Sequence, residues 1–165
     1  MSSLVQSQFR APFRGRFEIK LDPKGRLSLP TAYRQTLPAL HAELVVTNSR
    51  YRNRSCLDVY SQPEWEKLEA RMAKLPNLNT NVQAFTRFYL SAGQSLEIDA
   101  QNRILVPQGL RRFASLENQV VLIGLGNKFE IWSQEGWNAI SEQLSETFEA
   151  TMSAVAALEG EEGGS

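Results

Sequence analysis

Two short segments of the chain combine an aspartate with an arginine four residues later, Asp22 with Arg26 and Asp99 with Arg103. Turn-forming residues separate the two charges, so each pair spans a turn between strands rather than one face of a helix. The carboxylate in such a turn can accept backbone N–H groups while the arginine pairs with it. An arginine at a turn can also face outward and bind a phosphate or a guanine base. The residue types alone leave both roles open.

The two turns share one further position. Gly25 and Asn102 occupy equivalent places in them, and Gly and Asn are the residues that best tolerate a positive φ angle. We therefore predict the same structural turn in both segments. It is formed by Asp22, Gly25, Asp99, Asn102 and Arg103, together with Arg26.

The charge around the two turns differs. Near Arg26 the sequence places four further basic residues, Arg14, Arg16, Lys20 and Lys24. Near Arg103 it places Glu97, Gln101 and Asn102. We therefore predict that the first turn also faces a ligand.

Both turns belong to an internal duplication. Residues 19–30 align with residues 96–107 without a gap, and residues 57–65 align with residues 129–137. The alignment predicts two copies of one supersecondary unit, residues 13–75 and 92–148. The remaining segments are an N-terminal extension (1–12), a connecting helix (76–91) and an acidic tail (149–165) that we expect to be disordered.

Each copy is predicted to contain the same elements. Apolar residues alternate over 17–21 and again over 27–29, which predicts two strands joined by the Asp22 turn as a hairpin or looped pair. Short helices are expected over 31–37 and 62–75. Strands 44–47 and 57–60 are expected to form a second strand pair. The second copy is expected to hold the equivalent strands 95–98, 103–106, 120–124 and 129–132, and helices 108–114 and 134–148. Because so small a unit cannot close a core alone, we predict an α+β fold in which the two copies form one pseudo-twofold domain.

The composition hides a segregation of charge. The 165 residues include 18 basic and 18 acidic side chains, a net charge of zero. Residues 1–54 hold ten Lys and Arg against three acidic residues, whereas residues 129–165 hold eight Glu and no Lys or Arg. This asymmetry predicts a surface that faces a polyanion and an acidic end kept away from it. The segment Arg50–Arg54 is a second basic group, which either keeps an exposed loop soluble or contacts phosphates.

Composition also excludes several kinds of chemistry. Cys56 and His41 are the only residues of their types, so one chain can form neither a disulfide nor a Cys/His metal site. No serine lies in a G-x-S-x-G turn, and an arginine keeps each turn aspartate ionised, so we expect no enzyme, no cofactor and no small-molecule substrate. No apolar run is long enough to cross a membrane and no signal peptide begins the chain, so we expect a cytoplasmic protein.

These features favour double-stranded DNA as the partner. A two-stranded β-ribbon fits the major groove, and an arginine can bind the O6 and N7 atoms of guanine with two hydrogen bonds. Nearby Lys and Arg would neutralise phosphates.

Several motifs resemble those of the MraZ family. They are Phe13-Arg14-Gly15, Leu21 to Pro30, Tyr33-Arg34, Pro63-Glu64-Trp65, Asp99 to Arg103 and Gly126 to Trp132. The resemblance spans residues 13–148 and implies a bacterial transcriptional regulator of the division and cell-wall gene cluster. It implies two AbrB-like units of the swapped-hairpin (SpoVT-AbrB) type in each chain, homo-oligomeric rings of eight or more chains, and association with the nucleoid. Short G-rich direct repeats in promoter DNA would be its binding sites.

The resemblance also assigns roles to residues. It places DNA contact on Lys24 and Arg26, with Arg14 as the next candidate, and the local charge adds Arg16. Asn102 stands where the family usually has Gly, so DNA contact is expected of the first turn rather than of Arg103. The AbrB-like fold leaves a second function open, an antitoxin module whose acidic C-terminal tail wraps a partner protein.

Overall fold

The computed structural model describes residues 12–38 and 42–163. The chain divides into two compact units, Met1–Gln134 and Glu135–Ser165. The two halves of the duplication, as far as Gln134, therefore share one compact unit. The predicted N-terminal extension lies outside the described residues, apart from Pro12.

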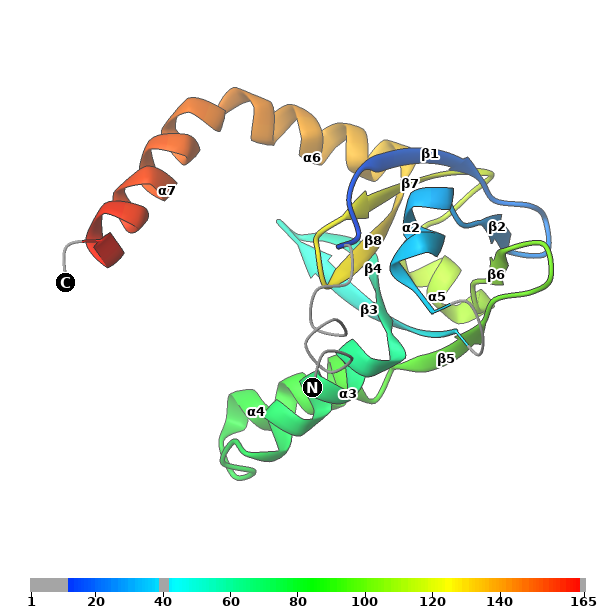
Figure 1. The fold of residues 1–165 in the computed structure, drawn as a ribbon, viewed down its shortest axis with the longest axis horizontal. Helices are drawn as coiled ribbons and strands as arrows, with labels where there is room; N and C mark the ends of the chain where they lie inside the picture. Colours follow the sequence, from blue (N-terminus) through cyan, green and yellow to red (C-terminus); the bar gives the residue numbers. More distant parts are fainter. Residues whose placement is uncertain (1–11, 39–41, 164–165) are drawn as a thin grey trace. The chain divides into compact units, whose positions relative to one another are not determined.

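The first unit has a mixed α+β fold, in which an antiparallel six-stranded sheet, a two-stranded ribbon and short helices pack together (Figure 1). The strand order in the sheet is β1-β7-β8-β4-β3-β5, and β2 pairs with β6 in the ribbon. The strands are β1 (Arg16–Lys20), β2 (Arg26–Ser28), β3 (Glu43–Tyr51), β4 (Arg54–Ser61), β5 (Gln94–Glu97), β6 (Arg103–Leu105), β7 (Gln119–Gly124) and β8 (Lys128–Ser133). The helices are α2 (Thr31–Thr36), α3 (Gln62–Ala73), α4 (Thr80–Phe85), the π-helical turn η1 (Thr86–Leu90) and α5 (Gln108–Phe113). Every strand predicted from the sequence is present.

The pairing of the strands corrects one prediction. β1 and β2 flank the Asp22 turn but do not pair as a hairpin, because β1 pairs with β7 and β2 pairs with β6. β5 and β6, their counterparts in the second half, likewise separate and pair with β3 and β2. Apolar alternation defines a strand and its buried face but not its partner, so the sequence pattern could not exclude a hairpin. The predicted pairs of strands later in each copy, β3 with β4 and β7 with β8, are confirmed.

The main core is shared by the two halves of the duplication. Leu27 and Ile104, equivalent residues of β2 and β6, lie directly opposite each other and are both almost fully buried. They join Tyr33 from the first half and Phe129 from the second half in one apolar cluster. Neither half would bury these side chains alone, as the sequence predicted.

A second cluster covers the other face of the sheet. Leu44 and Val46 of β3 belong to the main core, whereas Val45 between them packs with Trp65 of α3 and Tyr89 of η1. Both faces of this strand are therefore buried, which explains its unbroken apolar run. The predicted connecting helix is present as α4 followed by η1, and the side chain of Asn79 caps its start.

The second unit consists of helical segments. α6 spans Gln134–Glu146, as predicted, and α7 spans Phe148–Gly163, where the sequence predicted a disordered tail. Glycines and acidic residues suggested disorder, but Ala, Met, Leu and Glu dominate residues 148–159 and are good helix formers, which outweigh Gly160. None of the helices in the described residues is long and apolar enough to span a membrane.

Candidate nucleic-acid interface

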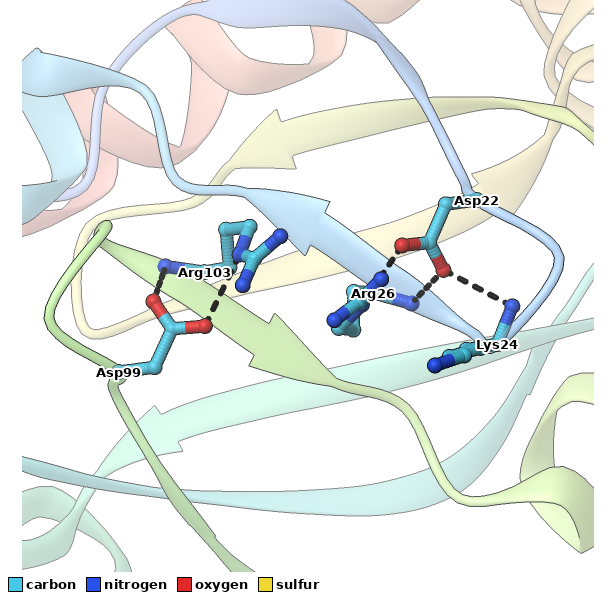
Figure 2. A network of polar contacts seen from close by, with 5 residues as sticks. All are labelled: Asp22, Lys24, Arg26, Asp99 and Arg103. Carbon is cyan, nitrogen blue, oxygen red and sulfur yellow. Dashed lines mark hydrogen bonds and ion pairs between the residues drawn. The ribbon is translucent and has the colours of Figure 1, made fainter.

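The first Asp/Arg turn is closed by the aspartate (Figure 2). Oδ1 of Asp22 accepts the backbone N–H groups of Lys24 at 2.9 Å and Arg26 at 2.8 Å. Oδ2 accepts the side-chain Nε–H of Arg26 at 2.7 Å. The backbone N–H of Arg26 and its guanidinium hold the pKa of Asp22 below its usual value of 3.8, so the carboxylate stays ionised.

The second turn repeats this geometry. Asp99 accepts the backbone N–H groups of Gln101 and Arg103 at 2.8 and 2.9 Å, and Nε–H of Arg103 at 2.9 Å. The backbone N–H of Arg103 is the main cause that lowers the pKa of Asp99. The predicted positive φ angles are present at both equivalent positions, +92° at Gly25 and +58° at Asn102.

Each turn is also braced by an arginine from the other half of the duplication. Arg111 of α5 donates from Nε to the carbonyl of Val106 at 2.9 Å and lies directly over Gly25. Arg34 of α2, its equivalent, donates from Nε to Oδ1 of Asn102 at 3.2 Å. The duplication therefore preserves two kinds of arginine, one within each turn and one that packs on the opposite turn.

The ribbon brings the two turn arginines to one surface. Arg26 and Arg103 come from the neighbouring strands β2 and β6, whose register pairs Ser28 with Arg103 (Figure 2). Both side chains line two shallow depressions of about 470 and 510 Å³. Their Nε atoms are engaged by aspartates, whereas their terminal amino groups make no hydrogen bond within the described part of the chain. The two guanidinium groups are thus fixed at one end and open at the other.

The predicted basic cluster divides into two groups. Lys20 lines the same depression as Arg26, and Lys24 is exposed in the turn itself. Arg14 and Arg16 are exposed at the opposite end of β1, and four residue steps of extended strand separate Arg16 from Lys20 by about 13 Å. The two lysines, which are near Arg26 in the sequence, are therefore also near it in space. Arg14 and Arg16 are not.

Both halves of the duplication are similar to a known protein family. The family model described as "MraZ protein, putative antitoxin-like" matches residues 13–88 and 90–157. The chain belongs to the MraZ family. Curated proteins named "Transcriptional regulator MraZ" are similar over most of their length. The protein of Methylococcus capsulatus is 44% identical to this chain, over 81% of this chain and 87% of its own length. That of Marinobacter nauticus is 42% identical, over 77% of this chain and 85% of its own length. That of Ligilactobacillus salivarius is 39% identical, over 83% of this chain and 92% of its own length.

The two MraZ matches meet near residue 89, within η1, so each match contains one Asp/Arg turn. Sequence reasoning missed the place of Arg103 beside Arg26 on the ribbon. The charges that neighbour each turn in the sequence do not reveal that the turns are close in space, because only the long-range pairing of β2 with β6 brings them together. The equivalence of the two turns in the duplication was the available signal.

A partly buried cluster of one thiol and two carboxyl groups lies elsewhere in this MraZ-family chain. Ligand atoms of Cys56, Asp58 and Glu130 lie within 4.8 Å of one another. Lys128 donates from Nζ to Oδ2 of Asp58 at 2.9 Å, and the indole N–H of Trp132 donates to Oε1 of Glu130 at 2.9 Å. Burial raises the pKa of the Cys56 thiol, which therefore stays protonated at neutral pH. A lysine already supplies the positive charge of this cluster, so we assign it a structural role.

Proposed function

We propose that this MraZ-family protein is a sequence-specific, DNA-binding transcriptional regulator of the bacterial division and cell-wall gene cluster. The observation that carries the proposal is the pair Arg26 and Arg103, each held by an aspartate and open at its terminal amino groups on one ribbon. The relatives named transcriptional regulators support the same function.

The ribbon would read bases from the major groove. Two terminal amino groups of one guanidinium can donate to O6 and N7 of guanine, and each such pair discriminates against other bases by about 1–3 kcal/mol. The Cα atoms of Arg26 and Arg103 are diagonal neighbours across an antiparallel pair, about 7–8 Å apart. This separation is close to two base-pair steps, which suits recognition of a short G-rich element.

Other basic residues would bind the phosphate backbone. Lys20 and Lys24 flank Arg26 and are placed to contact phosphates beside the groove. Arg14 and Arg16, at the far end of β1, would contact phosphates further along the duplex. These contacts would set the register of the ribbon without reading sequence.

One ribbon makes few base contacts, so we propose that several act together. A homo-oligomeric ring of eight or more chains would present many ribbons to direct repeats and raise their effective concentration. The exchange of strands between the two halves of the chain supports an AbrB-like, swapped-hairpin arrangement. Such a regulator would work in the cytoplasm, on the nucleoid.

The proposal predicts that Arg26→Ala abolishes specific DNA binding and leaves the oligomer intact. The variant loses the guanine contact, about 1–3 kcal/mol for each engaged ribbon, while Asp22 keeps its backbone hydrogen bonds. Gel shift with the DNA upstream of the protein's own gene, combined with size-exclusion chromatography, measures both properties. Arg71→Ala, on the exposed face of α3, is the control for loss of one positive charge. Unchanged affinity of Arg26→Ala would contradict the assignment.

The description of the matched family as antitoxin-like favours a second candidate. In that function the acidic C-terminal segment would bind a small partner protein. Co-purification of a stoichiometric small toxin with the native chain would support it over the regulator.

A further inference from the structure

The hairpin between β3 and β4 ends in a concentrated positive charge that the ribbon does not use. We call residues Arg50–Arg54 the basic hairpin tip. All five residues are exposed, and they include three arginines and Tyr51. None of the three arginines forms an ion pair within the part of the chain that the structure describes. The tip therefore carries an uncompensated charge of +3.

The tip has a defined conformation. Arg52 and Asn53 have φ angles of +50° and +64°, the pattern of a tight two-residue hairpin turn. Nη2 of Arg50 donates to the carbonyl of Asn53 at 2.8 Å, and the guanidinium of Arg52 lies 5.7 Å from the centre of the Tyr51 ring. Glycine, asparagine and aspartate are the usual residues at such positive φ angles. Arginine at position 52 breaks this local preference, as residues at functional sites often do.

The tip lies far from the ribbon. Glu43, at the other end of β3, pairs with Glu97, two residues before the Asp99 turn. Eight residue steps of extended strand separate Glu43 from Tyr51, about 27 Å. Figure 1 accordingly shows the hairpin of β3 and β4 extending away from β2 and β6. One duplex segment bound at the ribbon would leave the tip open to another.

The arginines are displayed on both faces of the hairpin. Tyr51 pairs with Arg54 and Arg50 pairs with Ser55, and successive pairs point to opposite faces of an antiparallel hairpin. A duplex groove is bordered by phosphates on two sides, so it can meet both faces of an inserted hairpin, whereas an acidic protein helix would cover one. Guanidinium groups bind phosphate oxygens well in such planar, two-point geometry.

We propose that the basic hairpin tip binds the phosphate backbone of duplex DNA without regard to sequence, as a second DNA-contacting surface opposite the ribbon. It would let one assembly hold two segments of DNA, a property that the proposed base recognition by the ribbon does not provide.

The test uses the full chain with an inactivated ribbon, Arg26→Gln with Arg103→Gln. A fluorescein-labelled duplex of random sequence is the probe, and anisotropy gives its affinity between about 50 and 200 mM salt. Adding R50Q, R52Q and R54Q is expected to weaken binding at low salt and to reduce the slope of log affinity against log salt by about 2.7, or about 0.9 per phosphate contact. Unchanged affinity and slope would overturn the proposal.

The matched control removes the same charge elsewhere. R71Q, K74Q and R87Q lie on exposed positions of the α3–η1 segment and are expected to leave both quantities near those of the ribbon variant. An equal loss in this control would attribute the effect to net charge and overturn the proposal. A changed elution volume of the tip variant alone would also overturn it, because the tip would then be a contact between copies of the chain. The probe carries no promoter site. The affinity of the tip for it therefore tests this proposal even if the protein fails to recognise a promoter.

Discussion

At the scale of single residues, Gly25 is the position at which the first turn is most sensitive to change. Its φ angle of +92° is strained for any residue with a side chain, and an added Cβ would lie 2.5 Å from Nε of Arg111. Asn102, its equivalent, adopts +58° and uses its side chain to accept a hydrogen bond from Arg34. The two halves thus meet the same backbone requirement with different residues.

We therefore predict that Gly25→Ala destabilises the fold by about 1–3 kcal/mol, the usual cost of a strained backbone position. Urea unfolding followed by circular dichroism measures the change. Gly109→Ala in α5 is the control, because nothing lies within 4 Å of its added Cβ. A helical Gly→Ala change is expected to stabilise by about 0.5–1 kcal/mol. Equal stability of Gly25→Ala and the wild type would show that Arg111 and the turn adjust freely.

At the scale of elements, the two strand–turn–strand segments depend on ionised carboxylates. Hydrogen bonds from the backbone N–H groups of Arg26 and Arg103, and their guanidinium groups, lower the pKa of Asp22 and Asp99 from the usual 3.8. Each group therefore releases its proton more readily in the folded state than in the unfolded state. The resulting stabilisation is fully present above pH 3.8 and is lost as the pH falls through the lower, folded-state pKa.

Because the pKa values are lowered in the folded state, we predict that the double variant Asp22→Asn, Asp99→Asn is less stable than the wild type at pH 6. The gap in stability between the two proteins should narrow below about pH 3.8. Thermal unfolding of both proteins from pH 6 to pH 2.5 measures the gap. Side-chain titration of the two aspartates by NMR should give pKa values below 3.8 in the folded wild type. A gap that stayed constant with pH would mean that the carboxylates stabilise the turns only as neutral hydrogen-bond acceptors.

The elements also show where sequence reasoning succeeds and where it stops. Alternation and duplication predicted the strands and both turns, because these features depend on neighbours in the chain. The partners of β1 and β2 are long-range, so the sequence predicted a hairpin or looped pair where the two strands separate, and it did not predict that Arg103 lies beside Arg26. The separation of Arg16 from Lys20 follows from the extended strand between them and was predictable. The helix α7 was missed because the glycines and acidic residues near the end of the chain suggested disorder, whereas most of residues 148–159 are good helix formers.

At the scale of the whole molecule, a net charge of zero conceals opposite local charges. The second unit, Glu135–Ser165, contains seven Glu and no Lys or Arg, whereas the ribbon and the β3–β4 hairpin of the first unit expose several cations. Charges in solution act over only about 10 Å at 0.1 M salt. The local charge at the contact, rather than the zero sum, therefore governs binding to a polyanion.

Binding to the DNA upstream of the protein's own gene is accordingly predicted to weaken steeply between low and physiological salt. Lys20 and Lys24 of each engaged chain alone contribute about −1.8 to the slope of log affinity against log salt, at about −0.9 per phosphate. The variant K20Q, K24Q should lose that part of the slope and keep its preference for the promoter over a random duplex, because phosphate contacts carry no sequence information. Fluorescence anisotropy with both duplexes across a salt series measures slope and preference together. A flat titration of the wild type would point to a partner other than nucleic acid, and a lost preference in the variant would mean that the lysines contact bases.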